Sequence, residues 1–137
     1  MKKIHDDFLE PPQQQLNNLI EYYQAGRYVD AEKLSLSITQ EFPKHQFAWK
    51  VLAVLLKRNG RINESLIVSK KSVQLDPQDA EAHNNLGVLL QEQGKLDEAE
   101  ISHRKAIELK PEYAEAHNNL GNTLKKQDKL EGAEKCY

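Results

Sequence analysis

Apolar residues recur along this chain at three- and four-residue steps, and short polar segments interrupt them. The clearest apolar stripe consists of Ala82, Leu86, Leu89 and Leu90. Spacing of this kind places the side chains on one face of an amphipathic helix. Gly94 breaks the stripe, and a second one begins at Leu96 and ends before Pro111. The pattern therefore predicts two consecutive helices joined by a tight turn.

The two-helix pattern repeats with a step of 34 residues. The prolines on this step are Pro43, Pro77 and Pro111, and the glycines are Gly26, Gly60 and Gly94, with Asp128 next in line. Small residues keep the step at Ala31, Ser65, Ala99 and Ala133. The segment AEAHNNLG occurs at 80–87 and again at 114–121. Independent series with one period indicate a repeat protein.

Each repeated residue has a physical reason to stand where it does. Glycine takes a left-handed backbone without a Cβ clash and so closes the turn between two helices. Aspartate tolerates that conformation better than most residues, so we expect Asp128 to close the last turn. Proline cannot continue a helix and therefore ends each second helix. Small residues fit where two helices cross closely.

These signals predict helices over 12–25, 28–41, 46–59, 62–75, 80–93, 96–109, 114–127 and 130–137. We expect an N-terminal extension, 1–11, followed by one repeat domain, 12–137. Its units are 12–45, 46–79, 80–113 and a truncated 114–137. Each helix is short enough to be marginal alone, so stability must come from the stacking of neighbouring pairs.

Composition excludes several classes of protein. The formal net charge of the 137 residues is −2, whereas a general nucleic-acid binder carries a basic excess. No apolar run approaches the ~20 residues of a membrane span, and no secretory signal opens the chain. The single cysteine, Cys136, excludes an intramolecular disulfide or a cysteine-based zinc site within one chain. We expect a cytoplasmic protein in which Cys136 packs inertly or is a free thiol.

The repeat resembles the tetratricopeptide repeat, a 34-residue helix–turn–helix unit with key residues at fixed offsets. The third unit matches it at His83, Leu86, Gly87, Leu90, Ala99, His103, Ala106 and Pro111. The first unit matches less well, because Asn18 and Leu19 stand where Leu-Gly is expected. The resemblance covers residues 12–137 and implies an all-α, right-handed solenoid of antiparallel helix pairs.

The family resemblance implies that the first helix of each pair lines a concave groove that binds a peptide or partner segment. The residues that we assign to this groove by register are Lys50, Lys57, Asn84, Asn85, Asn118, Asn119 and Asn122. An asparagine amide both donates and accepts, so it can pair with the backbone of an extended peptide of any sequence. Asn17, Asn85 and Asn119 share one repeat position, similar to the asparagine ladder in the arms of O-linked N-acetylglucosamine transferases. A partly structural role of these asparagines is the alternative.

The distribution of charge suggests a contact with an acidic peptide and argues against a clamp for a C-terminal carboxylate. The second unit carries six Lys or Arg and three Asp or Glu, and Lys57, Arg58 and Arg61 cluster in it. An acidic peptide docking there and a plain solvated face are both open. Some chaperone-binding relatives clamp a C-terminal carboxylate, but Glu115 here would repel it, so we do not expect such a clamp.

The sequence shows no catalytic constellation, no phosphate-binding loop and no cofactor motif. His83 and His117 share a position that is usually bulky in the family, so packing is a better interpretation than metal binding. His103 likewise replaces a family aromatic. We therefore expect a non-enzyme without metal or cofactor.

Three functional hypotheses follow. The first is a protein-interaction module whose partner the sequence does not identify. The second is the N-terminal, substrate-presenting arm of a longer glycosyltransferase or sulfotransferase, because the fourth unit stops at Tyr137 within its second helix. The third is self-assembly into a homo-oligomer through this uncapped end, since solenoid ends normally need a polar cap. A frayed terminus is the plain alternative to the last two.

Overall fold

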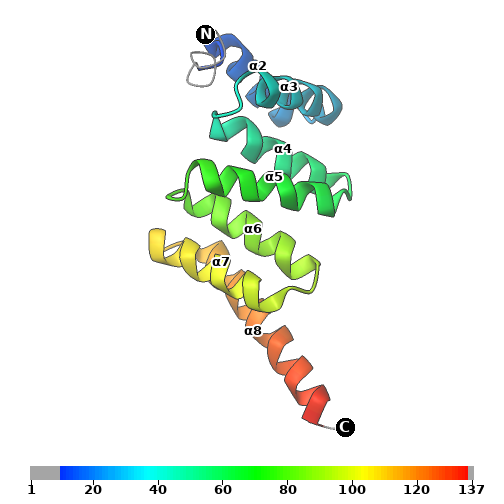
Figure 1. Ribbon diagram of the computed structural model, residues 1–137, viewed down its shortest axis with the longest axis vertical. Helices are drawn as coiled ribbons and strands as arrows, with labels where there is room; N and C mark the ends of the chain where they lie inside the picture. The colour runs from blue at the N-terminus through cyan, green and yellow to red at the C-terminus, as the bar shows by residue number, and fades with distance from the viewer. Residues whose placement is uncertain (1–9, 136–137) are drawn as a thin grey trace. The chain divides into compact units, whose positions relative to one another are not determined.

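The computed structural model describes residues 10–135, and the side chains of residues 10–131. The described chain consists of helices and turns (Figure 1). The helices are α2 (Gln13–Gln24), α3 (Tyr28–Glu41), α4 (Gln46–Arg58), α5 (Ile62–Leu75), α6 (Ala80–Glu92), α7 (Leu96–Leu109) and α8 (Ala114–Lys135). The expected all-α helical-repeat fold is confirmed, and the predicted bounds from 12 to 109 hold to within one residue.

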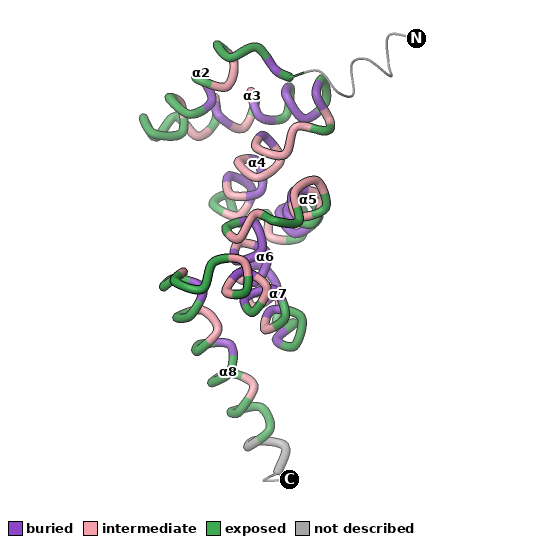
Figure 2. Tube along the Cα trace, turned by 90° about the vertical axis from the view of Figure 1, so that its left-hand side faces the viewer, coloured by how far each residue is buried: buried purple, intermediate pink, exposed green. Residues whose placement is uncertain are grey.

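The chain divides into two compact units, 1–76 and 77–137. In the first unit, α2 packs on α3, α3 on α4 and α4 on α5. The core of this unit consists of Leu19, Ala31, Ile38, Phe42, Ala48 and Leu55. In the second unit, α7 packs against both α6 and α8. Figure 2 shows that buried residues are frequent along α6, whereas residues 124–131 of α8 are largely exposed.

The turns between paired helices form as the glycines predict. Gly26, Gly60 and Gly94 have φ of 76°, 77° and 78°, in the left-handed region. The amide after each glycine returns to a carbonyl in the last helical turn, as when Lys95 N donates to Leu90 O over 2.9 Å. These bonds satisfy carbonyls that a helix end would otherwise leave without a partner. The small residues Ala31, Ser65 and Ala99 are fully buried, as expected at close helix crossings.

The expected turn at Asp128 is wrong. Helix α8 continues through this residue to Lys135, and no residue other than glycine has a positive φ in the described part of the chain. Aspartate tolerates the left-handed backbone but does not favour it as glycine does. The structure accordingly continues the helical hydrogen bonds through this residue.

Among the described residues, no helix combines the length and apolar character needed to cross a membrane. In the same part of the chain, no group of three or more His, Cys, Asp or Glu could hold a metal ion.

Candidate functional site

The inter-repeat junctions are tied by one repeated hydrogen bond. The indole Nε1 of Trp49 donates to the carbonyl of Pro43 over 3.0 Å. Its counterparts one and two repeats later, His83 and His117, bond through Nε2 to the carbonyls of Pro77 (2.8 Å) and Pro111 (2.9 Å). A carbonyl only accepts, so each imidazole carries its proton on Nε2. These side chains are therefore structural, as expected, and they also tie each proline turn to the following helix.

Asn84 does not line a groove. Its side chain is fully buried, and its Oδ1 accepts from His103 Nδ1 at 2.9 Å and from Asn119 Nδ2 at 3.2 Å. The amide thus links α6 to α7 and α8 inside the second unit. A buried amide held by two neighbouring helices cannot reach a peptide, so assigning Asn84 to ligand contact was wrong.

His103 is buried against α6. A Cβ built on Gly87 would stand 2.5 Å from His103 Cε1, so the imidazole fills the space that glycine leaves. Burial lowers the pKa of His103 below its ordinary value, because the charged form loses its hydration. In the described part of the chain, His103 Nε2 and Asn84 Nδ2 are buried without a hydrogen-bond partner.

The remaining asparagines of the second unit lie differently. Asn118 and Asn122 on α8 are exposed, and Asn85 on α6 is half-buried. Asn119 is half-buried and uses its Nδ2 for Asn84. Among residues 10–131, the side chains of Asn85, Asn118 and Asn122 have no hydrogen-bond partner, so their amides are available to a ligand.

A second bond holds α6 and α8 together beside these amides. Thr123 is fully buried, and its Oγ1 donates to Gln91 Oε1 over 2.9 Å. With the Asn119–Asn84 bond, it fixes the spacing of the two helices that present the asparagines. We call Asn85, Asn118, Asn119 and Asn122 the amide surface of the second unit.

In the first unit, Asn17 is exposed on α2 and accepts from Gln13 Nε2 over 3.0 Å. It lies in a different unit from Asn85 and Asn119, so the expected three-membered ladder remains a prediction. Within the second unit, Asn119 bonds to Asn84 across the helices.

The basic side chains of the first unit are partly engaged. Arg58 lies over the ring of Tyr28, with Cζ 3.8 Å from the centroid. Arg61 pairs with Glu64 and, over 3.3 Å, with Glu32. The Glu64 pairing raises the pKa of Arg61 and lowers that of Glu64. Within the predicted basic cluster, these two carboxylates therefore largely balance the positive charge of Arg61.

Lys50 and Lys57 are half-buried on α4, on the first helix of their hairpin as expected. The structure places these two residues on the predicted element, and their contact with a peptide stays a prediction.

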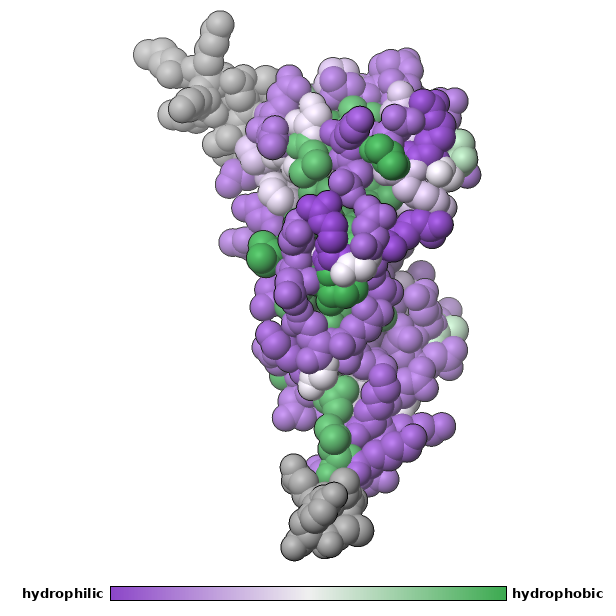
Figure 3. All heavy atoms as spheres, turned by 90° about the vertical axis from the view of Figure 1, so that its right-hand side faces the viewer, coloured by the Kyte–Doolittle hydropathy of each residue, from purple (hydrophilic) through white to green (hydrophobic). Residues whose placement is uncertain are grey.

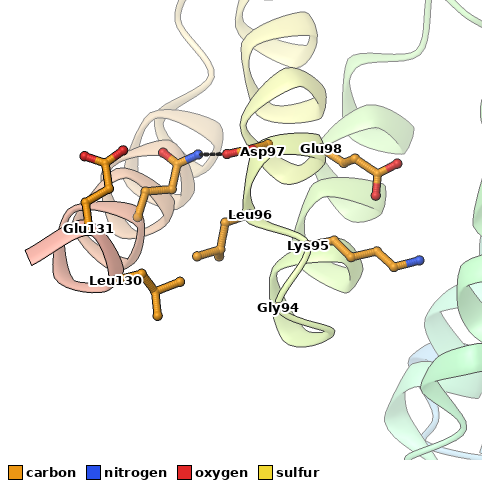
Figure 4. A pocket seen from close by; sticks show the side chains of 8 residues that line it. Gly94, Lys95, Leu96, Asp97, Glu98, Leu130 and Glu131 are labelled. Carbon is orange, nitrogen blue, oxygen red and sulfur yellow. Dashed lines mark hydrogen bonds between the residues drawn. The ribbon is translucent and has the colours of Figure 1, made fainter. Parts of the chain in front are cut away.

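A pocket that the sequence did not predict lies where α8 runs past the start of α7 (Figure 4). Its volume is about 460 Å³, and its lining residues are Gly94, Lys95, Leu96, Asp97, Glu98, Gln127, Leu130 and Glu131. Gln127 Nε2 donates to Asp97 Oδ1 over 2.9 Å at one side. The pocket exists because α8 continues beyond Asp128, so the wrong turn prediction concealed it. The lining carries both basic and acidic side chains, so the charge of the pocket indicates neither an anionic nor a cationic ligand.

Two family models match the chain. One, described as TPR repeat, matches residues 89–128, and the other, described as Tetratricopeptide repeat, matches residues 69–101. A comparison with curated protein sequences gives no match.

Solved structures match over most of the chain. The first repeat domain of Spaghetti (RPAP3), bound to an HSP90 peptide, has 20% identity and a TM-score of 0.80, covering 86% of this chain and 96% of that one. The Yersinia enterocolitica chaperone SycD, in complex with a peptide of the translocator YopD, has 19% identity and a TM-score of 0.75, covering 84% and 93%.

An O-GlcNAc transferase from Thermobaculum terrenum has 28% identity and a TM-score of 0.76. The match covers 82% of this chain and only 22% of the transferase chain. The sequence resemblance to such arms is thereby confirmed as a similarity of the repeat region. Residues 69–128 therefore match models of the tetratricopeptide repeat family, and over most of its length the chain has a fold similar to that of solved tetratricopeptide-repeat structures.

Proposed function

We propose that this chain is a protein-interaction module that binds an extended peptide on the amide surface of the second unit. The observation that carries the proposal is the set of amides on α6 and α8 that have no partner within residues 10–131: Asn85, Asn118 and Asn122. The support from related folds is that the Spaghetti domain and SycD are both seen with bound peptides.

The chemistry of the surface suits a peptide backbone. An extended peptide presents N–H and C=O groups along both edges, and an asparagine side chain can pair with either group. Asn119 contributes differently, because its Nδ2 is used by Asn84 while its Oδ1 can still accept. Binding through main-chain groups tolerates many peptide sequences, so any preference for a particular sequence must come from contacts with the side chains of the peptide.

In the first unit, the proposal assigns Lys50 and Lys57 to acidic residues of a peptide. The support is their place on α4 and the excess of Lys and Arg over residues 46–79. Attraction of this kind is screened by salt, and for exposed pairs it is typically worth about 0–1 kcal/mol. The two lysines would therefore make only a small, salt-dependent contribution to binding at the first unit.

A peptide selected from a displayed library of random sequences supplies the probe for the test. The double substitution Asn85→Ala with Asn122→Ala should weaken its binding by more than ~1 kcal/mol, since each lost hydrogen bond contributes about 0.5–1.5 kcal/mol. The matched control is Gln40→Ala with Gln74→Ala, which removes two exposed amides from α3 and α5. Equal affinity of the two double variants would remove the amide surface from the proposal.

A second candidate function is that of a repeat arm presenting substrate to a catalytic domain. The observation that favours it is the 28% identity to the O-GlcNAc transferase, of which this chain matches a minor part. The intact mass of the native protein in its source cells tests it. A mass near 15.7 kDa would contradict an arm, and a much larger mass would support it.

A further inference from the structure

The first unit departs from the repeat pattern at the start of α3. Ile62 and Leu96 begin α5 and α7, whereas Tyr28 begins α3. The ring of Tyr28 meets the ring of Tyr23 edge-on, with the two centroids 5.7 Å apart. The guanidinium of Arg58, at the end of α4, lies over the Tyr28 ring with Cζ 3.8 Å from the centroid. Two aromatic rings therefore connect the end of α2 to an arginine at the end of α4.

The contact with Tyr28 holds Arg58 in place and leaves its hydrogen-bonding groups available. A guanidinium over a ring uses its flat face, whereas its five N–H groups point outward in its own plane. The nearby carboxylate of Glu32 is already engaged, because it pairs with Arg61 over 3.3 Å and accepts from Asn59 Nδ2 over 2.9 Å. In the described part of the chain, Arg58 has no hydrogen-bond or ion-pair partner. It is therefore a positioned cation that lacks an anion.

Exposed apolar side chains lie beside this cation. Ile20 and Tyr23 stand three residues apart on α2, so they share one face of the helix, and they are 40% and 39% exposed. Val54 is half-buried on α4, one helical turn before Arg58. On the face of the first unit drawn in Figure 3, apolar side chains lie beside strongly hydrophilic ones. We call Ile20, Tyr23, Tyr28 and Arg58 the arginine–tyrosine site.

The chemistry of this site fits a carboxylate with an apolar side chain close to it. A carboxylate can accept two parallel hydrogen bonds from one guanidinium, which fixes its orientation as well as its position. A free inorganic anion would leave Ile20 and Tyr23 uncovered. In an extended peptide, side chains two residues apart lie on the same side, about 7 Å from each other. That spacing matches a site in which the apolar part and the cation are joined through the Tyr28 ring.

We propose that the arginine–tyrosine site binds a partner segment in which Asp or Glu stands two residues from an apolar residue. The carboxylate accepts from the guanidinium of Arg58, and the apolar side chain packs on Ile20 and Tyr23. This inference rests on the proposed peptide-binding function and adds the sequence preference that main-chain contacts do not provide. It uses none of the asparagines of the amide surface.

Two displayed libraries of random peptides provide the first test. One library fixes a glutamate two residues from a leucine, in either order, and the other replaces the glutamate with glutamine. Both are selected on the unmodified chain at the same protein concentration. The glutamate library should be enriched about fivefold or more over the glutamine library, since charge-assisted paired bonds are roughly twice as strong as neutral ones.

Substitutions then locate the contact, with one peptide selected from the glutamate library as the probe. Arg58→Gln should weaken its binding by about fivefold or more. Arg58→Lys should also weaken it, because an ammonium group keeps the charge but lacks the planar fork. Tyr28→Leu, which places the residue type of Leu96 at this position, should weaken it by about threefold. The matched control Lys33→Gln removes one positive charge from an exposed position of α3 and should leave the affinity unchanged.

Equal enrichment of the two libraries, or enrichment of neither, would overturn the proposal. So would either Arg58 variant binding as tightly as the unmodified chain, or Lys33→Gln being weakened as much as Arg58→Gln. The double variant Asn85→Ala with Asn122→Ala separates this inference from the proposed function. A loss of affinity in that double variant alone would overturn the arginine–tyrosine site and keep the amide surface. A loss in Arg58→Gln alone would support the arginine–tyrosine site and remove the amide surface.

Discussion

The imidazole of His103 lies so close to Gly87 that a methyl group on this glycine would stand 2.5 Å from Cε1. The two residues come from α7 and α6, and their approach defines how closely the helices of this hairpin can pack. The equivalent glycine of the next repeat, Gly121, has open space in the same direction. Gly87 and Gly121 are thus equivalent repeat positions in one chain, the first with a packed neighbour and the second without one.

Gly87→Ala should destabilise the protein by roughly 1–3 kcal/mol, because the added methyl overpacks a buried contact. Gly121→Ala should be neutral or stabilising by up to about 1 kcal/mol, because alanine is the better helix former where space is open. Urea unfolding followed by circular dichroism, at low micromolar concentration, measures both. Equal losses for the two variants would contradict the observed contact.

The lowered pKa of His103 predicts a pH dependence of stability. The unfolded chain binds a proton near the ordinary pKa of 6.5, whereas the folded chain resists protonation until lower pH. The unfolded state therefore binds more protons, and the free energy of unfolding falls as pH drops below about 6.5. Protonation would also give buried Nε2 a hydrogen that has no acceptor within residues 10–131.

The measurement compares the unmodified chain with His103→Gln in urea at about pH 7.5 and about pH 5.5. The difference between the two proteins isolates His103 from the other histidines. The unmodified chain should lose more stability on acidification than the variant. Parallel losses would show that His103 does not resist protonation in the folded state.

Asn84 and Asn118 are equivalent in sequence and opposite in burial. Asn84→Ala should cost about 1–3 kcal/mol of stability, since it leaves His103 Nδ1 and Asn119 Nδ2 without their acceptor. Asn118→Ala should stay within about 0.5 kcal/mol, as exposed substitutions usually do. Thermal and urea unfolding of the two variants would decide. A harmless Asn84→Ala would mean that this bond network contributes nothing.

The bond from Trp49 to Pro43 predicts that the indole N–H stabilises the first unit. Trp49→Phe keeps an aromatic ring and removes the donor, so it should cost about 0.5–1.5 kcal/mol plus some packing. Because Trp49 is the single tryptophan, circular dichroism rather than fluorescence should follow unfolding. Trp49→His tests the mechanism, since histidine makes the same bond at His83 and should retain part of the stability.

Most of the fold was predictable because glycine and proline restrict where a helix can end: glycine permits the left-handed turn, and proline cannot continue a helix. The helices over 28–41, 62–75 and 96–109 have the expected bounds, since each begins after a glycine turn and ends before a proline. Asp128 was not predictable in the same way. Aspartate permits a left-handed turn but does not favour it as glycine does, so its place in the repeat did not decide the local structure.

The site was predictable only in part, because repeat position does not determine burial. Asn84 and Asn118 occupy the same place in identical segments, yet only Asn84 is covered by a following helix. That covering depends on a contact between residues 35 apart, Asn84 and Asn119, which no local pattern reveals. The proline carbonyls that Trp49, His83 and His117 bind were missed although their spacing of six residues is regular.

The central claim is that the amide surface contacts the bound peptide. The most direct measurement is a spectrum of ¹⁵N-labelled protein that resolves the side-chain NH₂ resonances, recorded with and without a selected peptide. The account predicts that the resonances of Asn85, Asn118, Asn119 and Asn122 shift while those of Gln40 and Gln74 stay in place. Saturating binding that leaves the four asparagine resonances unmoved would contradict it.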